Sequence, residues 1–179
     1  LRLTTQGYEV EILEKYHQAG GRLNEMKMDG FTFDVGPSFF SMSYEFDELF
    51  KSCKIDNPLT YQQLDPLYVV NFAGSEKRYK IYKDLKKLAE EFKDIEPDFE
   101  AKARKYLDNA KAIFHDTEYK VIKRNFNGMA GYLMSLATVP WKHAPRMFRS
   151  MWAELDNYFE SNEVKVIFSL VSFFLGDTP

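Results

Sequence analysis

The sequence has little cysteine and little histidine. Its 179 residues include one cysteine, Cys53, so no disulfide can form within the chain. One free thiol suits a reducing compartment, and we interpret Cys53 as a small buried hydrophobe on a helix. The three histidines, His17, His115 and His143, are scattered and have no partners at metal-ligand spacing. We therefore expect no metal site.

Long hydrophobic runs are also missing. The longest largely apolar run, Val166 to Leu175, is about half of the roughly 20 residues that a membrane-spanning helix needs. The chain opens at Leu1 without an initiator methionine, a basic flank or a cleavage site, so we expect no secretory signal. These absences favour a cytoplasmic protein whose contact with membranes, if it has one, is peripheral.

Acidic residues are missing from one long stretch. The chain has a formal net charge of −3, but residues 119–153 contain no acid and six bases. The bases are Lys120, Lys123, Arg124, Lys142, Arg146 and Arg149. The rest of the chain therefore carries a net charge of −9, and this asymmetry calls for a partner or a structural reason.

The composition is otherwise that of a globular protein. Hydrophobic residues make up 45% and charged residues 28%, which excludes a disordered chain. Aromatics are abundant at 16%, with 16 Phe and 11 Tyr. They indicate either an aromatic-rich core or a cavity for a large apolar ligand.

The first residues have the layout of the second half of a βαβ unit. Residues 1–7 are typical of the last turns of a helix that Gly7 ends in a left-handed conformation. Residues 8–13 favour a strand, and Glu14 follows at its carboxyl end. The glycine-rich turn that precedes such a strand is absent, and by the usual spacing its last glycine lies roughly five residues before Leu1. We therefore expect the sequence to be a fragment.

The rest of the chain is predicted to be mostly helical, with one extended piece over 30–37 and one hairpin over 67–82 around Gly74 and Ser75. Pro97 is expected in the first turn of one helix. Apolar spacing predicts helices over 45–53, 83–95, 97–114, 153–161 and 162–176.

A carboxylate and a diglycine bend carry the candidate nucleotide chemistry. An acid at the end of the second strand of such a unit accepts hydrogen bonds from ribose hydroxyls, which is the role expected of Glu14. Gly20, Gly21 and Arg22 follow. The glycines let backbone amides approach an anion, and the arginine fork can hold a phosphate. Alone, Glu14 is more often a solvated carboxylate and the bend a flexible turn, so the hypothesis depends on their combination.

Three stretches, GYEVEILEK, AGGRL and GFTFDVGPS, together resemble the bacterial and archaeal phytoene desaturases, the carotenoid desaturase branch of the FAD-dependent amine-oxidase-like flavoproteins. In that family a strand ending in Glu-Lys is followed by Gly-Gly-Arg and then by Phe-x-x-Asp-x-Gly-Pro-Ser or a close variant. The last stretch, FSLVSFFLGDTP, is similar to the family's helix closing in Gly-x-x-Pro. The resemblance is strong over residues 1–50 and looser beyond.

The resemblance implies a fold of the α/β plus α class. A partial Rossmann-like FAD-binding domain, without its glycine-rich turn, is expected over 1–66. A mostly helical, hairpin-containing start of a substrate-binding and membrane-docking domain is expected over 67–179. The cofactor implied is FAD, and the cofactor-binding residues implied are Glu14, Lys15, Gly20, Gly21, Arg22, Leu23, Gly36, Pro37 and Ser38. For Asp34, a carboxylate that bonds the amides of its own turn is at least as good an interpretation as a role beside the flavin.

The activity implied is desaturation of a carotenoid precursor such as phytoene. A flavin takes the hydride at its own ring, so the protein mainly orients and desolvates the substrate, and no catalytic acid or base is assigned. Some family members have an acid just before the Met of the segment FNGM, where this sequence has Asn127 and Gly128. The fragment itself is expected to be inactive and to hold FAD poorly.

The segment 119–153 combines its six bases with methionines and aromatics, which suits docking on an anionic membrane surface. The alternative is that the aromatics are core and the bases solvated. Nothing matches a nucleic-acid reading module. Two other functions stay open: another flavoenzyme of the superfamily, of the amine or porphyrinogen oxidase type, and a non-catalytic membrane-surface binding module.

Overall fold

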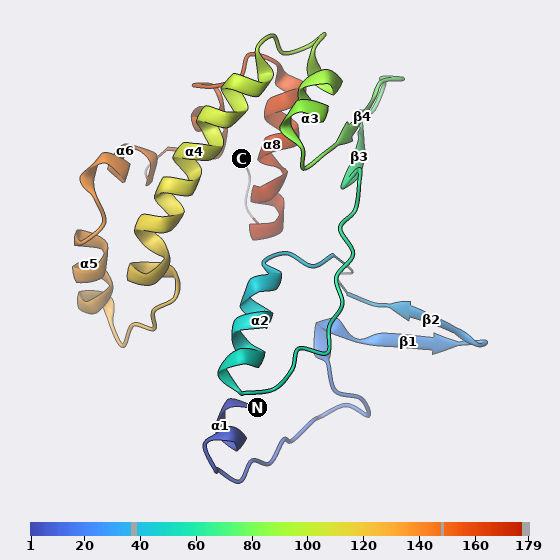
Figure 1. Ribbon diagram of the computed structural model, residues 1–179, viewed down its shortest axis with the longest axis vertical. Coiled ribbons are helices and arrows are strands. Elements are labelled where there is room, and N and C mark those ends of the chain that lie inside the picture. Colours follow the sequence, from blue (N-terminus) through green and yellow to red (C-terminus); the bar gives the residue numbers. More distant parts are fainter. Residues whose placement is uncertain (37–38, 148, 177–179) are drawn as a thin grey trace. The chain divides into compact units, whose positions relative to one another are not determined.

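The computed structural model describes residues 1–36, 39–147 and 149–176 (Figure 1). Two of the predicted site residues, Pro37 and Ser38, lie outside the described residues, as does the end of the Gly-x-x-Pro motif. The chain divides into two compact units, Leu1–Gln63 and Leu64–Pro179. The assignment of residues 1–66 to FAD and of 67–179 to substrate stays a prediction.

Unit 1, Leu1–Gln63, contains short elements and little buried surface. Its elements are the helix α1 (Arg2–Thr5), the 3₁₀ turn η1 (Gly21–Leu23), the strands β1 (Glu25–Met28) and β2 (Phe31–Asp34), and the helix α2 (Ser43–Ser52). Gly7 follows α1 with a φ of +86°, which confirms the predicted left-handed end. Cys53 caps α2 and is the only buried residue of this unit among those described. Its interpretation as a buried hydrophobe is confirmed.

The predicted strand over residues 8–13 is wrong. These residues form no regular structure and are exposed, with Ile12 at 83% and Leu13 at 86%. A β-rich sequence becomes a strand only where a neighbour completes its hydrogen-bond ladder. In the described part of the chain, β1 and β2 pair with each other and β3 with β4, and no strand lies alongside 8–13. Glu14 therefore follows an irregular segment here.

Unit 2, Leu64–Pro179, is one hairpin followed by helices (Figure 1). The predicted hairpin is confirmed, with β3 and β4 antiparallel and Asn71 opposite Arg78. The helix predicted over 153–161 is shorter and begins earlier, because α7 spans Met151–Leu155. The prediction that Pro97 lies in the first turn of a helix is wrong: α4 begins at Phe99 with Asp98 as its N-cap, so Pro97 precedes the helix. The elements are β3 (Tyr68–Asn71), β4 (Arg78–Ile81), α3 (Leu85–Phe92), α4 (Phe99–Thr117), the π-helix η2 (Glu118–Ile122), α5 (Met129–Ala137), the 3₁₀ turn η3 (Trp141–His143), α6 (Ala144–Met147), α7 (Met151–Leu155) and α8 (Asn162–Leu175).

The core of unit 2 is aromatic, as the composition indicated. Side chains of β4, α3, α4, α7 and α8 form one buried cluster, and Figure 1 shows α3 beside the hairpin. Phe99 is its centre, with ring centroids 4.9 Å from Phe92, 5.9 Å from Phe159 and 6.0 Å from Phe168. The rings of Phe92 and Phe168 meet Phe99 edge to face and that of Phe159 is stacked on it; both arrangements stabilise a core beyond the area that it buries. For this group, core is the correct interpretation.

A buried carboxylate joins the α3–α4 loop to the start of α8. Glu96 is fully buried and accepts hydrogen bonds from the amides of Glu160 and Ser161, at 2.9 and 2.8 Å, and from Lys102 Nζ at 2.5 Å. Burial alone raises the pKa of Glu96, but the Lys102 hydrogen bond and the two amides outweigh it and lower that pKa below the usual 4.5. The ionised form of Glu96 therefore stabilises unit 2.

Candidate functional site

The β1–β2 hairpin brings two of the predicted motifs together. Its register pairs Glu25 with Asp34, and the amide of Val35 donates to Asn24 O at 2.9 Å, which extends the pairing toward the bend. One residue further, a Cβ atom added to Gly36 would lie 2.0 Å from the carbonyl oxygen of Arg22. Real Cβ atoms do not approach backbone so closely, so this contact requires glycine. The Gly-Gly-Arg bend and the Asp-x-Gly-Pro-Ser block therefore meet.

The diglycine bend is open on its outer side. Gly20 and Gly21 have φ values of +124° and +55°, a backbone region that favours glycine. The Leu23 amide donates to Gly20 O at 2.9 Å and closes the turn η1. A Cβ at Gly21 would meet nothing within 4 Å. Arg22 is exposed, and no other described residue pairs with its guanidinium. Free space and an unpaired guanidinium are what a phosphate needs, so the geometry of this bend is compatible with binding a phosphate group.

The remaining predicted site residues make only local contacts. Glu14 accepts a hydrogen bond from the Tyr16 amide at 2.9 Å, and Lys15 Nζ lies 5.5 Å from the centre of the Tyr16 ring. Leu23 is 73% exposed. No described contact joins Glu14 to the bend, so the structure brings Gly36 to Arg22 but leaves the carboxylate on its own segment.

Asp34 lies at the exposed end of β2, directly opposite Glu25 in the hairpin. Sequence reasoning missed β1, the partner strand that makes this pairing, because a strand reading Glu-Met-Lys-Met has weak β-propensity. The signal that could have found it is the Asp29-Gly30 dipeptide, a hairpin turn sequence in which both residues have positive φ.

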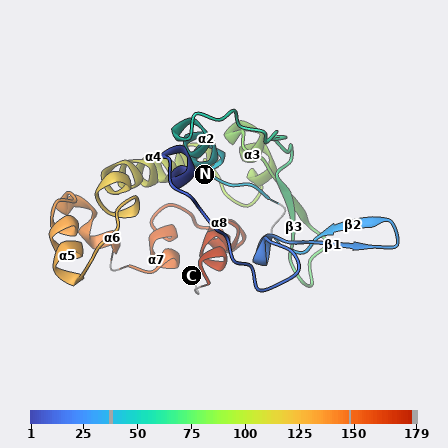
Figure 2. The ribbon, with the colours of Figure 1, turned by 90° about the horizontal axis from the view of Figure 1, so that it is seen from below.

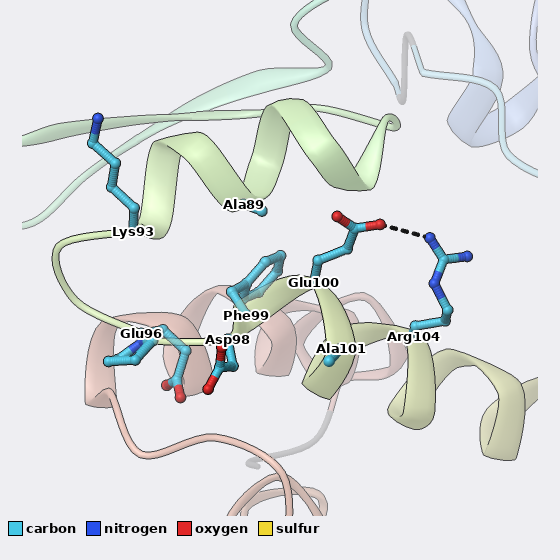
Figure 3. Close-up of a pocket in the computed structure, with 9 residues that line it drawn as sticks. Ala89, Lys93, Glu96, Asp98, Phe99, Glu100, Ala101 and Arg104 are labelled. Atoms are coloured by element: carbon cyan, nitrogen blue, oxygen red, sulfur yellow. Dashed lines mark hydrogen bonds and ion pairs between the residues drawn. The ribbon is translucent and has the colours of Figure 1, made fainter.

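The cavities of unit 2 lie on other elements. One of about 500 Å³ is formed where α3 and α4 meet, beside Phe99 (Figure 3). Two of its carboxylates already have partners within the protein: Glu100 pairs with Arg104 at 2.8 Å, and Glu96 accepts hydrogen bonds from Lys102 and from the two amides before α8. We therefore interpret this cavity as a feature of the packing between α3 and α4 and propose no ligand for it.

Neither a metal site nor a membrane span is found in the part of the chain that the structure describes. There, no three His, Cys, Asp or Glu side chains are grouped as metal ligands. Across the same residues, no helix combines the length and the apolarity that crossing a bilayer demands.

Four of the six bases of 119–153, namely Lys123, Lys142, Arg146 and Arg149, have acidic partners that flank the segment. Arg146 Nε lies 2.9 Å from Glu154 and Arg149 3.5 Å from it. Lys142 lies 3.4 Å and the buried His143 2.7 Å from Asp116. The hydrogen bond with His143, together with Lys142, holds the pKa of Asp116 below its usual value. These acids lie just outside residues 119–153, so the composition of that segment alone does not reveal them.

Apolar side chains of the same segment stay exposed. The largest exposed fractions are those of Trp141 at 84%, Met134 at 73% and Met129 at 71%. Tyr119 at 69%, Ile122 at 56% and Leu133 at 54% belong to the same segment. For these residues, the interpretation of the aromatics and methionines of 119–153 as core is wrong.

Comparison with known proteins gives one family and a consistent set of relatives. A family model described as flavin containing amine oxidoreductase matches residues 1–166. A zeta-carotene-forming phytoene desaturase of Myxococcus xanthus is 28% identical over 180 residues, which cover 99% of this chain and 34% of that protein. A 4,4'-diapophytoene desaturase (4,4'-diapolycopene-forming) of Methylomonas sp. is 25% identical over 99% of this chain and 34% of its own length. A 4,4'-diaponeurosporene-forming enzyme of the same kind from Staphylococcus aureus strain Newman is 26% identical, with 99% and 36% covered. The chain thus spans about a third of the length of these curated relatives.

Proposed function

The chain belongs to the flavin containing amine oxidoreductase family. On that premise we propose that it is part of an FAD-dependent oxidoreductase that desaturates a carotenoid precursor such as phytoene. Relatives whose names state desaturation of phytoene or diapophytoene match 99% of the chain. Unit 1 then belongs to a Rossmann-like FAD-binding domain, and unit 2 begins the substrate-binding domain.

The observation that carries the proposal is the contact between Gly36 and Arg22. It joins the two motif blocks at one place, beside an open diglycine bend and an arginine without a described partner. A structural turn alone requires neither an unpaired arginine nor space beside Gly21.

Each residue has a distinct role in this proposal. Arg22 and the amides of Gly20 and Gly21 hold the pyrophosphate, and Glu14 receives the ribose hydroxyls. Gly36 keeps the second motif against the bend. Lys15 follows Glu14 and Leu23 follows Arg22, so these two residues flank the ribose contact and the pyrophosphate contact.

When bound, FAD supplies the hydride acceptor for oxidation of an unactivated C–C bond. The chain's own contribution is to bind and orient. We assign it no proton-transfer residue, because Asn127 and Gly128 stand where some relatives have an acid.

Activity tests the proposal directly. The full-length gene that contains the coding sequence of this chain is expressed in cells that accumulate phytoene, and extracted pigments are separated by chromatography. We expect products with longer conjugation, absorbing at longer wavelength than phytoene. Unchanged phytoene in cells that contain the soluble protein would refute the desaturase. Parallel assays with amines and with porphyrinogens test the other members of the family.

The segment 119–153 adds a place and a partner to the proposal. Water-insoluble carotenoid precursors must be taken from a bilayer, and a surface with exposed Trp141, Met134 and Met129 beside basic residues suits that task. We therefore propose a cytoplasmic protein that docks peripherally on anionic membranes through this segment.

A further inference from the structure

A basic cavity lies in unit 2 where α4, α6 and α7 approach one another. It has a volume of about 380 Å³, and four cationic side chains line it: Lys105, Lys142, Arg146 and Arg149. Lys105 comes from α4, far from the other three in sequence, so the fold assembles the cluster. Figure 2 shows α6 and α7 following α5 beside α4.

The charges of this cavity do not cancel. Glu154, which also lines it, pairs with Arg146 and Arg149, and Asp116 lies 3.4 Å from Lys142. Four cations against two carboxylates leave a net charge of +2. Lys105 is exposed, and the described residues offer it no partner. A cavity lined by uncompensated cations attracts an anion.

The arginines are held in place by the floor of the cavity. Tyr158, 9% exposed, accepts a hydrogen bond from Arg146 Nη2 at 3.2 Å and donates to Glu154 Oε1 at 3.3 Å. A guanidinium has five N–H donors, and these contacts occupy only some of those of Arg146. The others remain for a tetrahedral oxyanion, whose oxygens match the arginine fork.

We propose that this cavity binds a phosphate group, carried by the headgroup of an anionic membrane lipid. The lipid source is favoured over free phosphate because Trp141, which directly precedes the cavity residue Lys142 in sequence, is 84% exposed and can enter a bilayer. The inference rests on the proposed membrane docking for the source of the phosphate and names the subsite that reads the headgroup.

The test compares two lysines of the same helix. Lys105 lines the cavity, whereas Lys111 is exposed on α4 away from it. Binding of the chain is measured by sedimentation with phosphatidylcholine vesicles that contain phosphatidylglycerol. We expect Lys105→Gln to weaken binding about fivefold, Lys105→Arg to restore most of it, and Lys111→Gln to leave it unchanged. Circular dichroism checks that each variant is folded.

The outcomes separate the two proposals. Equal binding by Lys105→Gln and Lys111→Gln, with strong binding by the unmodified chain, overturns the headgroup cavity and leaves the docking segment standing. Titration with inorganic phosphate is the second arm. If the vesicles do not bind but phosphate does, and Lys105→Gln abolishes that, a lipid source is wrong and docking fails with it. Binding of neither probe overturns both.

Discussion

The backbone of Gly36 packs directly against the backbone of Arg22, so closely that a methyl group on Gly36 would lie 2.0 Å from the Arg22 carbonyl oxygen. The β1–β2 register creates this contact, since the Val35 amide already bonds Asn24 O at 2.9 Å. The hairpin thus holds the backbone of the second motif against the arginine of the first motif.

Gly36→Ala is expected to break the backbone contact between residue 36 and Arg22. Overpacking against backbone costs about 1 to 3 kcal/mol, so amide hydrogen exchange over residues 24–35 should become faster. In the full-length protein that contains this chain, FAD should also bind more weakly. The matched control is Gly131→Ala in α5, where an added Cβ meets nothing within 4 Å and the helix should gain about 0.5 to 1 kcal/mol. Exchange over 24–35 that is the same in both variants would show that the contact has no such role.

In the full-length protein that contains this chain, Arg22→Gln should lower the affinity for FAD without unfolding the protein. The guanidinium is exposed, and no described residue pairs with it. Hydrogen bonds to a charged group are worth about 1.5 to 3 kcal/mol, so we expect roughly a tenfold to hundredfold weaker Kd. Quenching of flavin fluorescence on titration measures it. Lys51→Gln, the same change of charge on α2 of unit 1, is the control. An Arg22 variant that binds like this control removes the phosphate role.

Glu96→Gln should destabilise unit 2. Its carboxylate is the shared acceptor of Lys102 and the two amides before α8, and breaking one side of a buried ion pair costs about 3 kcal/mol or more. Glu100→Gln, which breaks only the exposed pair with Arg104, should cost about 0.5 kcal/mol or less. Urea unfolding of both variants gives the comparison.

The contribution of Glu96 also has a defined pH dependence. Its pKa is lower in the folded protein than the usual 4.5, so the unfolded chain binds the proton first as the pH falls. The stabilisation is therefore fully present above about pH 4.5 and decreases as the pH falls through the lower, folded pKa. We expect the difference between wild type and Glu96→Gln to shrink in acid. A difference that stays constant between pH 7 and pH 3 would contradict the ionised state of Glu96.

Local elements of this fold are readable from sequence because their signals are local. The hairpin over β3 and β4 has β-rich runs around Gly74, and α8 ends at Gly176 with a φ of +78°. The helices α3 and α4 have apolar residues at helical spacing, which face one aromatic core. In each case the residues that decide the structure lie within a few positions of one another.

What depends on distant partners was not readable. Residues 8–13 have the composition of a strand, but a ladder needs a neighbour that no spacing rule supplies. The acidic partners of Lys142, Arg146 and Arg149 are Asp116 and Glu154, which lie outside residues 119–153. Lys105 joins these three bases only through the packing of α4. The site follows the same rule. The motif residues were found by their types, whereas the contact of Gly36 with Arg22 required the register of β1, an unpredicted strand.

The exposed apolar side chains of 119–153 test the docking of the protein on membranes. Trp141 and Met134 are 84% and 73% exposed, so replacing them with serine removes little that the folded protein buries. Each apolar side chain that enters a bilayer contributes about 1.5 kcal/mol or more, so the double variant Trp141→Ser and Met134→Ser should bind anionic vesicles about a hundredfold more weakly. Val171→Ser changes another exposed apolar residue, 51% exposed on α8 and outside the segment, and should bind like wild type. If the double variant also sediments like wild type, the apolar side chains of the segment do not enter the membrane. Binding would then depend on the bases alone, and the exposed apolar surface of the segment would have no explanation.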